Sequence, residues 1–325
     1  MPKLILTGIT SFVGHHLALG FAAAGWEVTG VLSRPRSAYD GVQRQRLAGL
    51  PASVELQTLD LRDTPALQGL AYAVRPALWV HHAAHARDYA GFEFDLAAAC
   101  SVTLLPLYSL YPVLQAVGCH GVLLTGSSME YSDSEQPGCE VDACAPATPY
   151  GLSKLAETLA ALQLGTRYEL PTRVARLFIP FGPLDAPGKL ISYALGQLQE
   201  GRSVDLSPCA QQRDFLHVDD VVAAFLGLAG DLNRGGAEVV NVCRGEAVPL
   251  RTVLEALAEL VGAPRELLRF GQRPMRPGEP PVSYGDNSKA RHLLGWNPTP
   301  LAISLRRLVG ELTDAPAPAG ARRTS

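Results

Sequence analysis

A tyrosine and a lysine four residues apart, Tyr150 and Lys154, are the residues of this chain that most directly suggest chemistry. In a helix, residues at this spacing lie on one face, one turn apart. A phenol titrates near pH ~10 and is a poor base at neutral pH, but a neighbouring ammonium favours the phenolate. The pair therefore predicts a tyrosine that exchanges a proton with a substrate hydroxyl. An exposed helical tyrosine and lysine would show the same spacing, so the interpretation depends on the rest of the chain.

The amino terminus has the pattern of a strand, a glycine-containing turn and a helix. The apolar segment Leu4–Leu6 runs into Gly8, and helical periodicity follows Gly14. Gly8 permits a tight turn, Gly14 permits close approach of helix and strand, and the free amides at the helix start can bind a dinucleotide pyrophosphate. Ser11 occupies the place of the middle glycine, where its hydroxyl can contact a phosphate while its Cβ narrows the approach. The alternative interpretation is a turn that merely needs two glycines.

A third segment lies between these two. The apolar strand expected over Val122–Thr125 is followed by two hydroxyl side chains, Ser127 and Ser128. Ligands of doubly wound sheets bind beyond the carboxyl ends of the strands, so we expect one of these serines beside Tyr150. Serine after a strand is otherwise ordinary turn chemistry. The chain order of loop, serine and Tyr/Lys pair favours the functional interpretation.

Together these segments resemble the extended short-chain dehydrogenase/reductase family, in particular its branch of nucleotide-sugar epimerases, dehydratases and ketoreductases. The resemblance extends over nearly the whole chain except the tail. Further segments that carry it are Leu59–Asp63, His81–His85, Arg176–Pro183, Arg213–Asp220, Arg276–Glu279, Asp286–Ala290 and Leu294–Pro298. These motifs are specific for the family and much less specific for the reaction.

The resemblance implies roles for individual residues. Tyr150 would be the acid/base, Lys154 would bind the nicotinamide ribose and lower the pKa of Tyr150, and Ser127 would hydrogen-bond the reacting oxygen. The implied cofactor contacts are Gly8, Ser11, Phe12, Val13, Gly14, Ser33, Arg34, Asp60, Leu61, Ala83, Ala84, Tyr150 and Lys154. The implied substrate contacts are His85, Ser128, Met129, Ile179, Arg213 and Arg276. The two arginines are expected to clamp a diphosphate, because a guanidinium fork suits phosphate oxygens; structural ion pairs are the alternative.

Alternating strand and helix patterns predict an α/β fold with a Rossmann-type doubly wound parallel sheet. Strands are expected near Lys3–Leu6, Glu27–Leu32, Val54–Thr58, Ala77–His81, Val122–Thr125 and Thr172–Ala175. By resemblance, residues 1–177 form the dinucleotide-binding domain, to which residues 215–243 return. The rest of residues 178–312 forms a smaller C-terminal substrate-binding domain, with the substrate in the cleft between. Residues 313–325 lack an apolar period and are predicted to be a disordered tail.

The composition is that expected of a soluble cytoplasmic enzyme: 47% of the residues are hydrophobic and the net charge is −3. It gives no sign of a nucleic-acid partner. No apolar run is expected to reach the roughly 18 residues that span a bilayer, and the start is too short for a signal peptide, so no membrane association is predicted. The six cysteines lack Cys-x-x-Cys spacing and are predicted to be free thiols, with no metal site. The resemblance implies a homodimer through the helices at residues 95–116 and 150–162.

The choice of cofactor is argued from the end of the second strand, Val28–Arg36, where no carboxylate stands. A carboxylate there would accept the ribose hydroxyls of NAD and repel the additional phosphate of NADP, whereas Arg34 can pair with that phosphate. NADP(H) is therefore favoured, with NAD as the alternative. Arg34 and Arg36 as solvated loop charges are the competing interpretation.

Three reactions of the resembled branch compete: ketoreduction, epimerisation and 4,6-dehydration. The dehydratases carry a proton-accepting Glu at the place of Met129, and Glu130 is expected to point to the opposite face if the strand continues. Dehydration is therefore disfavoured. The NADP preference and Ile179, at a place where many epimerases and dehydratases carry Asn, favour reduction. We predict reduction of the 4-keto group of a nucleotide-diphosphate-linked 4-keto-6-deoxyhexose; a 4-epimerase with tightly bound NAD is the alternative, and a non-catalytic NADP-binding sensor a minor one.

Overall fold

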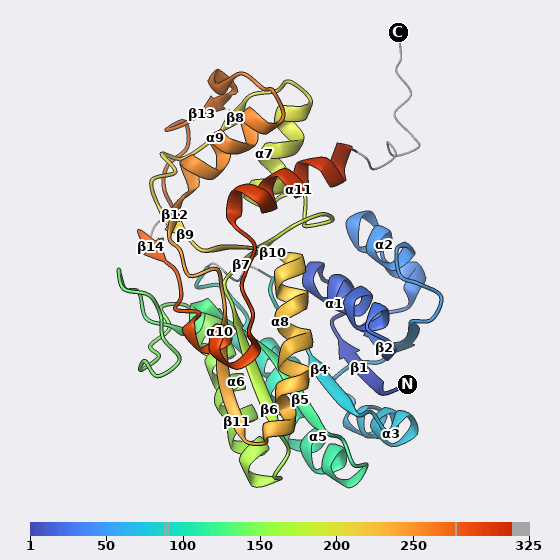
Figure 1. Cartoon of the computed structure of the whole chain (residues 1–325). Coiled ribbons are helices and arrows are strands. Elements are labelled where there is room, and N and C mark those ends of the chain that lie inside the picture. The colour runs from blue at the N-terminus through green and yellow to red at the C-terminus, as the bar shows by residue number, and fades with distance from the viewer. Residues whose placement is uncertain (88, 90, 277, 314–325) are drawn as a thin grey trace.

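A seven-stranded parallel sheet of order β11-β6-β5-β4-β1-β2-β3 forms the centre of the molecule (Figure 1). The computed structural model describes residues 1–87, 89, 91–276 and 278–313. The strands are β1 (Lys3–Thr7), β2 (Glu27–Leu32), β3 (Glu55–Thr58), β4 (Leu78–His81), β5 (Gly121–Ser127), β6 (Thr172–Leu177) and β11 (Ala237–Val242). The predicted fold class is confirmed, and all six predicted strands form.

The carboxyl ends of the middle strands bring the predicted site residues to one edge of the sheet. The strand β5 is longer than predicted and ends at Ser127, which lies opposite Leu177 of β6. On the other side of the sheet centre, Thr7 of β1 lies beside Val31 of β2. The phosphate loop after β1 and the loop after β2 therefore leave the sheet next to each other, as a dinucleotide site requires.

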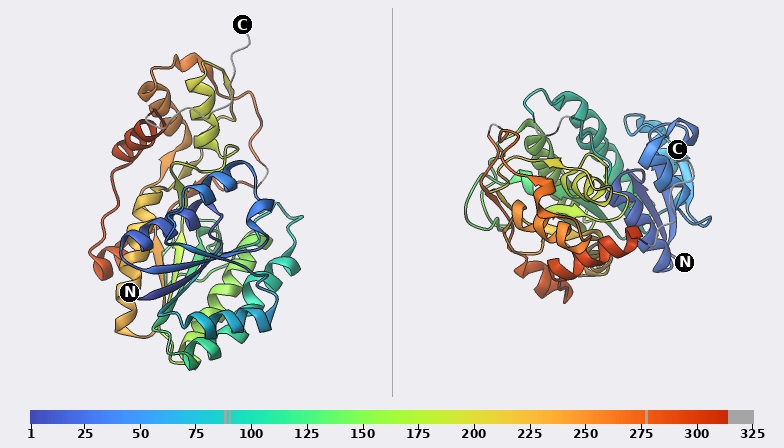
Figure 2. Two further views of the ribbon diagram at one scale, coloured as in Figure 1. Left: turned by 90° about the vertical axis from the view of Figure 1, so that its right-hand side faces the viewer. Right: turned by 90° about the horizontal axis from the view of Figure 1, so that it is seen from above.

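Helices cover both faces of the sheet (Figure 2). One layer consists of α1 (Phe12–Ala23), α2 (Gly41–Ala48), α8 (Val218–Asp231) and α10 (Ser288–Leu294), and the other of α3 (Thr64–Val74), α5 (Leu105–Ala116) and α6 (Pro149–Arg167). The start of α6 is fixed by its sequence: the Thr148 hydroxyl accepts the Gly151 amide at 3.1 Å, and Pro149 occupies the first turn. Such an N-cap contributes about 1 kcal/mol.

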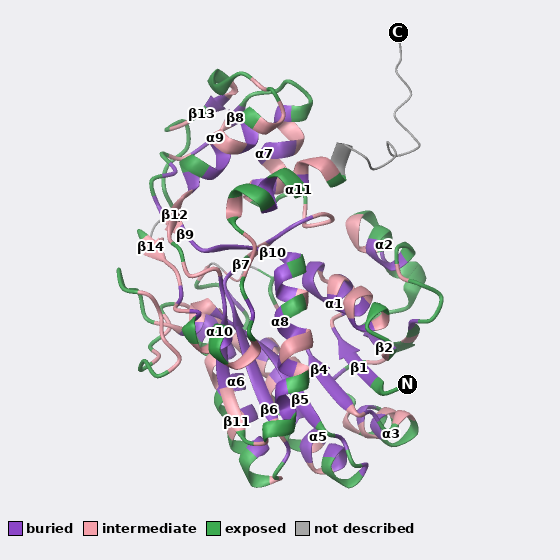
Figure 3. Ribbon diagram, viewed as in Figure 1, coloured by how far each residue is buried: buried purple, intermediate pink, exposed green. Residues whose placement is uncertain are grey.

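Two hydrophobic clusters fill the spaces between the sheet and its helical layers, and buried residues run along the central strands (Figure 3). Leu6 and Phe21 belong to the cluster under α1 and α8, whereas Ile5 and Tyr111 belong to the cluster under α5 and α6. Neighbouring residues of β1 thus pack on opposite faces, which is the period-2 alternation of a strand that is covered on both sides.

A second lobe stands above the carboxyl edge of the sheet and has its own hydrophobic cluster. Its elements are β7 (Ile179–Phe181), α7 (Leu190–Gln199), β8 (Val204–Asp205), β9 (Gln212–Arg213), β10 (Phe215–His217), β12 (Val248–Pro249), α9 (Leu250–Leu260), β13 (Leu268–Arg269), β14 (Val282–Ser283) and α11 (Leu301–Thr313). Thr313 is helical, and residues 314–325 of the predicted tail lie outside the described residues. The division into residues 1–177 with 215–243, and the rest of 178–312, stays a prediction.

One buried carboxylate joins three segments of the chain at the base of this lobe. Asp214 accepts hydrogen bonds from the backbone amides of Arg244 and Gly245, both at 2.8 Å, and of Gly285 at 3.5 Å. Burial raises the pKa of Asp214 to about 6, although the three amides oppose the rise. The Asp214 carboxylate therefore supplies the hydrogen-bond acceptors for backbone amides where the chain passes between the sheet and the second lobe.

The segment Leu96–Ala116 corrects one expectation about the chain. It comprises α4 (Leu96–Ala99), a π-helical turn (Cys100–Leu104) and α5. Its 21 residues, which include an 18-residue stretch with a mean hydropathy of 1.5, are long and apolar enough by length and composition to cross a membrane. The expectation that no apolar segment reaches this length is therefore wrong. In the fold, α5 packs against α3 and α6 and buries Leu107, Leu110 and Leu114.

Candidate active site

The loop after β1 has the geometry of a dinucleotide phosphate loop. Gly8 has φ +74°, and a Cβ on it would lie 2.8 Å from the Cα of Ala83 at the end of β4. Ser11 is the N-cap of α1 and accepts the Gly14 amide on its hydroxyl at 2.9 Å. The amides of the first two helical residues, Phe12 and Val13, have no intrahelical acceptor and can bind an anion. These residues fit a dinucleotide pyrophosphate, and Ser11 fits as the helix cap.

A histidine ties this loop to two strands. His82 contacts the Ser11 hydroxyl through Nε2 and the Thr125 hydroxyl through Nδ1, both at 2.8 Å. The Thr7 hydroxyl accepts the backbone amides of His82 and Ala83 at 3.0 Å. Burial lowers the pKa of His82 to about 3, and Lys154 contributes, so the imidazole is neutral. The hydroxyl of Ser11 is thus held at the loop by side chains from β4 and β5.

The structure brings Ser127, Tyr150 and Lys154 together beyond the end of β5. Tyr150 lies in the first turn of α6, and the Ser127 side chain is close enough to influence its titration. A Cβ on Gly151 would overlap the Met129 carbonyl, so this glycine lets the start of α6 approach the turn after β5. Burial raises the pKa of Tyr150, whereas Lys154 and the Ser127 side chain oppose the rise. Contrary to the expectation of a lowered pKa, the effect of burial is the larger one.

The ammonium of Lys154 is already paired. Its Nζ lies 2.7 Å from Oε2 of Glu157, and the two side chains are 5% and 0% exposed. Burial lowers the pKa of Lys154, but the charges of Glu157 and Tyr150 outweigh burial and raise it. Lys154 is therefore one partner of a buried ion pair with Glu157, and its charge is not isolated.

Ser127 is supported from behind by a second buried ion pair. Its amide donates to Oε1 of Glu130 at 2.7 Å, and the other carboxylate oxygen of Glu130 accepts from Nε of Arg176 at 2.8 Å. The strand does not continue past Ser127, because the chain turns through the 3-10 segment Ser128–Glu130. The expectation that a continuing strand would direct Glu130 to the opposite face is therefore wrong. The carboxylate is completely buried and engaged, and Met129 occupies the place of a dehydratase base.

The predicted cofactor residues after β2, Ser33 and Arg34, are exposed. The guanidinium of Arg34 lies over the Tyr39 ring at 4.4 Å and donates to Gln43 at 3.1 Å. The Ser33 hydroxyl lies 3.3 Å from the Tyr39 hydroxyl. Arg36 instead donates to the Leu47 carbonyl at 3.1 Å. Arg34 is thus held at the mouth of the loop, with its charge available to solvent.

The adenine side of the predicted site contains an ion pair. The Asp60 carboxylate is 2.6 Å from Nη2 of Arg62, and this contact lowers the pKa of Asp60. Leu61 is buried, whereas Ala83 and Ala84 follow β4 and are half-buried and exposed, respectively. The backbone of these segments is positioned for a cofactor contact, but Asp60 has a partner that the sequence did not indicate.

The predicted substrate residues are divided between the two lobes. Arg213 is bound by Oε1 of Glu279 at 2.9 Å, which agrees with the alternative interpretation as an ion pair. Arg276 is exposed on the loop before β14, and Ile179 is exposed on β7. Ser128 and Met129 are half-buried beside Tyr150, and the His85 ring lies 5.5 Å from the Phe94 ring. The structure does not bring Arg213 and Arg276 into contact with each other.

The family model of the NAD dependent epimerase/dehydratase family matches residues 4–243. The chain belongs to this family. The GDP-6-deoxy-D-mannose reductase of Pseudomonas aeruginosa is 28% identical, with 95% of this chain and 96% of that protein covered. The UDP-glucuronate 4-epimerase of Thermodesulfobacterium geofontis is 26% identical, with 92% of each covered. The solved structure of MoeE5 in complex with UDP-glucose and NAD has a TM-score of 0.80 and 27% identity, covering 96% of this chain and 99% of that one. The chain is an extended short-chain dehydrogenase/reductase enzyme.

Sequence reasoning missed a group of residues that surrounds Tyr150. The rings of Tyr89 and Phe94 lie at 5.6 Å from the Tyr150 ring, and Nζ of Lys189 donates to the Tyr89 hydroxyl at 3.0 Å. Residues 88 and 90 of this loop lie outside the described residues. No spacing in the sequence links Tyr89 to Lys189, one hundred residues away. Glu157, by contrast, is visible as an acidic residue at the i,i+3 position from Lys154.

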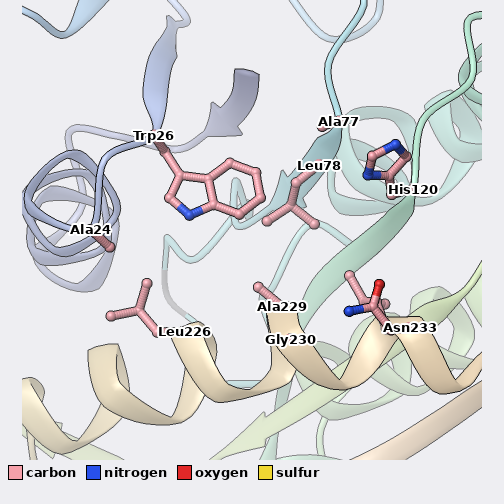
Figure 4. Close-up of a pocket in the computed structure, with 10 residues that line it drawn as sticks. Ala24, Trp26, Ala77, Leu78, His120, Leu226, Ala229, Gly230 and Asn233 are labelled. Carbon is pink, nitrogen blue, oxygen red and sulfur yellow. The ribbon is translucent and has the colours of Figure 1, made fainter. Parts of the chain in front are cut away.

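One cavity of the described structure lies away from this site. It has a volume of about 450 Å³ and lies at the amino ends of the strands, between the end of α8 and the residues that precede β2, β4 and β5 (Figure 4). Trp26, Leu78, His120 and Leu226 line it. Ligands of this fold bind at the opposite, carboxyl edge, where Tyr150 and the phosphate loop lie. The cavity is therefore a gap in packing at the far end of the sheet and does not mark the family's active site.

Proposed function

We propose that the protein is an NADP(H)-dependent oxidoreductase that reduces the 4-keto group of a nucleotide-diphosphate-linked 4-keto-6-deoxyhexose. The observation that carries the cofactor preference is the end of β2, where Arg34 is exposed and stacked on Tyr39 and where Val28–Arg36 contains no carboxylate. A guanidinium at this place pairs with the additional phosphate of NADP, and the missing carboxylate removes the usual partner of the NAD ribose.

In the proposed reaction each residue of the site has one task. The bound nicotinamide supplies the hydride that the sugar carbonyl carbon accepts. Tyr150 donates its hydroxyl proton to the carbonyl oxygen, and Ser127 hydrogen-bonds that oxygen as its negative charge develops. The Glu130–Arg176 pair fixes the Ser127 backbone behind it. Lys154, one turn along α6, would bind the nicotinamide ribose and stabilise the phenolate that remains on Tyr150.

The diphosphate of the sugar nucleotide would lie below the second lobe, against Arg213. In the described structure Glu279 occupies the guanidinium of Arg213, and the pKa of Arg213 is lowered by burial in spite of that carboxylate. Substrate binding therefore has to share or displace this ion pair. Arg276, on the exposed loop before Glu279, is proposed to approach the diphosphate when substrate binds.

A 4-epimerase with tightly bound NAD is the second candidate function. It is favoured by relatives whose names identify them as 4-epimerases, among them the one from Thermodesulfobacterium geofontis, and by the NAD in the MoeE5 complex. The same Ser127, Tyr150 and Lys154 would serve it. A non-catalytic NADP-binding sensor is disfavoured because these three side chains are intact and assembled.

The deciding experiment is to denature freshly purified protein, identify any released dinucleotide, and titrate the emptied enzyme with NADPH and NADH. We expect an empty site that prefers NADPH, turnover of a 4-keto-6-deoxy sugar nucleotide, and an increase of about tenfold in the NADPH Kd for Arg34→Ala with no change for NADH. Arg36→Ala is the matched control, because that side chain is bound to a carbonyl. If the purified protein retains NAD and Arg34→Ala leaves the NADPH affinity unchanged, epimerisation becomes the proposed function in place of reduction.

We also propose a homodimer through the outer faces of α5 and α6. Leu105 and Tyr108 of α5 and Leu152 and Leu159 of α6 are large apolar side chains that are 48% to 60% exposed. The two helices pack side by side, so these side chains lie on one uncharged surface. An exposed apolar surface of this kind is typical of a protein interface. Gel filtration at micromolar concentration is expected to give the mass of two chains; a monomer would refute the dimer.

A further inference from the structure

Glu157 is a buried acidic residue on the helix that carries the proposed proton donor. It lies on α6 three residues after Lys154, is 0% exposed, and places Oε2 at 2.7 Å from the lysine ammonium. Tyr150 precedes Lys154 by four residues on the same helix, so the side chains of Tyr150, Lys154 and Glu157 follow one another along a single face. Tyr150 is consequently next to a cation whose charge is largely offset by a carboxylate one turn further on.

The second oxygen of Glu157 faces a histidine. Oε1 lies 3.8 Å from Nε2 of His81, and neither atom has a hydrogen-bond partner among the described residues. Nδ1 of His81 receives the indole N–H of Trp79 at 3.5 Å, which leaves the proton of the neutral ring on Nε2. Burial lowers the pKa of His81 to about 3, so the ring is neutral. One oxygen of Glu157 is therefore bound by the Lys154 ammonium, and the other lies near an uncharged ring without a hydrogen bond to it.

We propose that Glu157 is a positioning residue that holds the Lys154 ammonium and offsets its charge at Tyr150, so that Tyr150 rests as the protonated donor that ketone reduction requires. The inference rests on the proposed function, because reduction begins with a phenol, whereas oxidation of a sugar hydroxyl begins with a phenolate. A lysine without Glu157 would favour the phenolate and prepare the site for the oxidative half of an epimerisation.

Other groups surround the three side chains and have to be separated from the effect of Glu157. They are His81 and His82 on β4, Cys100 and Tyr111 on the segment that packs against α6, and Glu130 after β5. The charge of Glu130 is fixed by Arg176, and both histidines are neutral at assay pH. Glu157 is therefore the group whose removal changes the charge at Lys154 without touching the Ser127 support.

The test is the titration of Tyr150 in the full-length enzyme, followed by NMR of ring-labelled tyrosine, with the Tyr150 signal identified by its absence in Tyr150→Phe. In Glu157→Gln we expect the pKa of Tyr150 to fall by about one unit or more, because the carboxylate that is removed opposes formation of the phenolate. The pH at which ketone reduction declines should fall with it. A pKa equal to that of the wild type in the folded variant overturns the proposal, even if the variant is less stable.

Two further variants complete the experiment. Glu259→Gln on α9 removes an exposed carboxylate far from the site and should leave the Tyr150 titration unchanged. Glu157→Asp withdraws the carboxylate from Lys154 by one methylene and should shift the titration in the same direction by a smaller amount, which decides the question if Glu157→Gln does not fold. Because the titration needs no substrate, a shifted pKa in a protein that epimerises and does not reduce would refute the proposed reaction and leave the role of Glu157 standing.

Discussion

Two buried arginines on β6, Arg173 and Arg176, stand three residues apart on opposite faces of the sheet and differ in how completely they are bound. All five N–H groups of Arg173 have acceptors: the Asp231 carboxylate at 2.6 Å and backbone carbonyls at 2.9 to 3.1 Å. Arg176 donates to Glu130 and lies over the Tyr131 ring at 4.5 Å, but its Nη1 has no hydrogen-bond partner among the described residues. The saturated arginine is at the amino end of β6, and the unsaturated one is at the active-site end.

The difference indicates that the amino edge of the sheet stabilises the fold and the carboxyl edge forms the site. At the amino edge, Arg173 closes the fold by joining β6 to the end of α8 and the turn before β11. At the carboxyl edge, buried polar groups such as Arg176, Glu157 and His81 keep atoms without partners. Each of those unpaired atoms lowers the free energy of unfolding. Such a loss of stability is typical of residues that are retained for a functional site.

The largest effect is expected for Arg173→Met. The variant leaves the buried Asp231 carboxylate with only the exposed Arg234, at 3.4 Å, as a counter-ion, so the free energy of unfolding should fall by about 3–5 kcal/mol. Urea unfolding at pH 7 measures it, and the folded fraction should retain wild-type turnover. The double variant Arg173→Met with Asp231→Leu is the control, because removal of both charges should restore most of the loss. A stability loss that the double variant does not recover would show that the backbone contacts, and not the ion pair, dominate.

Arg176→Met should give a smaller loss of stability, about 1–3 kcal/mol, and a larger loss of function. Burial already raises the pKa of Glu130, and Arg176 opposes that rise, so without the arginine the carboxyl can protonate. A raised folded-state pKa gives stability that is present at low pH and lost as pH increases, so the deficit should grow from pH 5 to pH 8. Turnover should fall about tenfold or more because Ser127 loses its fixed support. Equal stability losses in both arginine variants, with unchanged turnover, would remove the distinction between the edges.

Acid unfolding tests the third unsaturated group, His81. Its folded-state pKa is lowered from 6.5 to about 3 by burial, so its contribution is fully present above pH 6.5 and lost as pH falls towards 3. At pH 5 the wild type should have lost about 2 kcal/mol through this group, and His81→Gln should show a correspondingly flatter pH dependence. His292→Gln on the exposed face of α10 is the control. Parallel pH curves for the wild type and His81→Gln would contradict the assignment.

The smallest effect is expected for an exposed ion pair of similar length. Nη2 of Arg62 lies 2.6 Å from Asp60, but both side chains are about half exposed. Arg62→Ala should therefore change the free energy of unfolding by less than about 1 kcal/mol, and the change should disappear in high salt. A loss comparable with that of Arg173→Met would show that distance, and not burial, sets the value of these pairs.

The sequence predicted the carboxyl edge better than the partners behind it. Strand positions followed from apolar runs, and the sheet rule then placed Ser127 beside Tyr150. The pairing of Arg213 with Glu279, sixty-six residues away, follows from the path of the second lobe, which no local pattern contains. The neutralisation of Lys154 was missed for another reason: the i,i+3 spacing of Glu157 is visible, but the burial that gives the pair its electrostatic weight is a property of the whole fold.

The Asp214 junction has a consequence for how the chain is made. The amides that donate to Asp214 follow it by 30, 31 and 71 residues. At about 10 residues per second, the last of them, Gly285, is therefore synthesised about 7 s after Asp214. All strands of the central sheet are complete before that time, whereas the base of the second lobe lacks the Gly285 amide until then. The sheet is therefore complete before the second lobe closes, and nonsense mutations between Val242 and Gly285 should yield chains that form the sheet and fail to complete the second lobe.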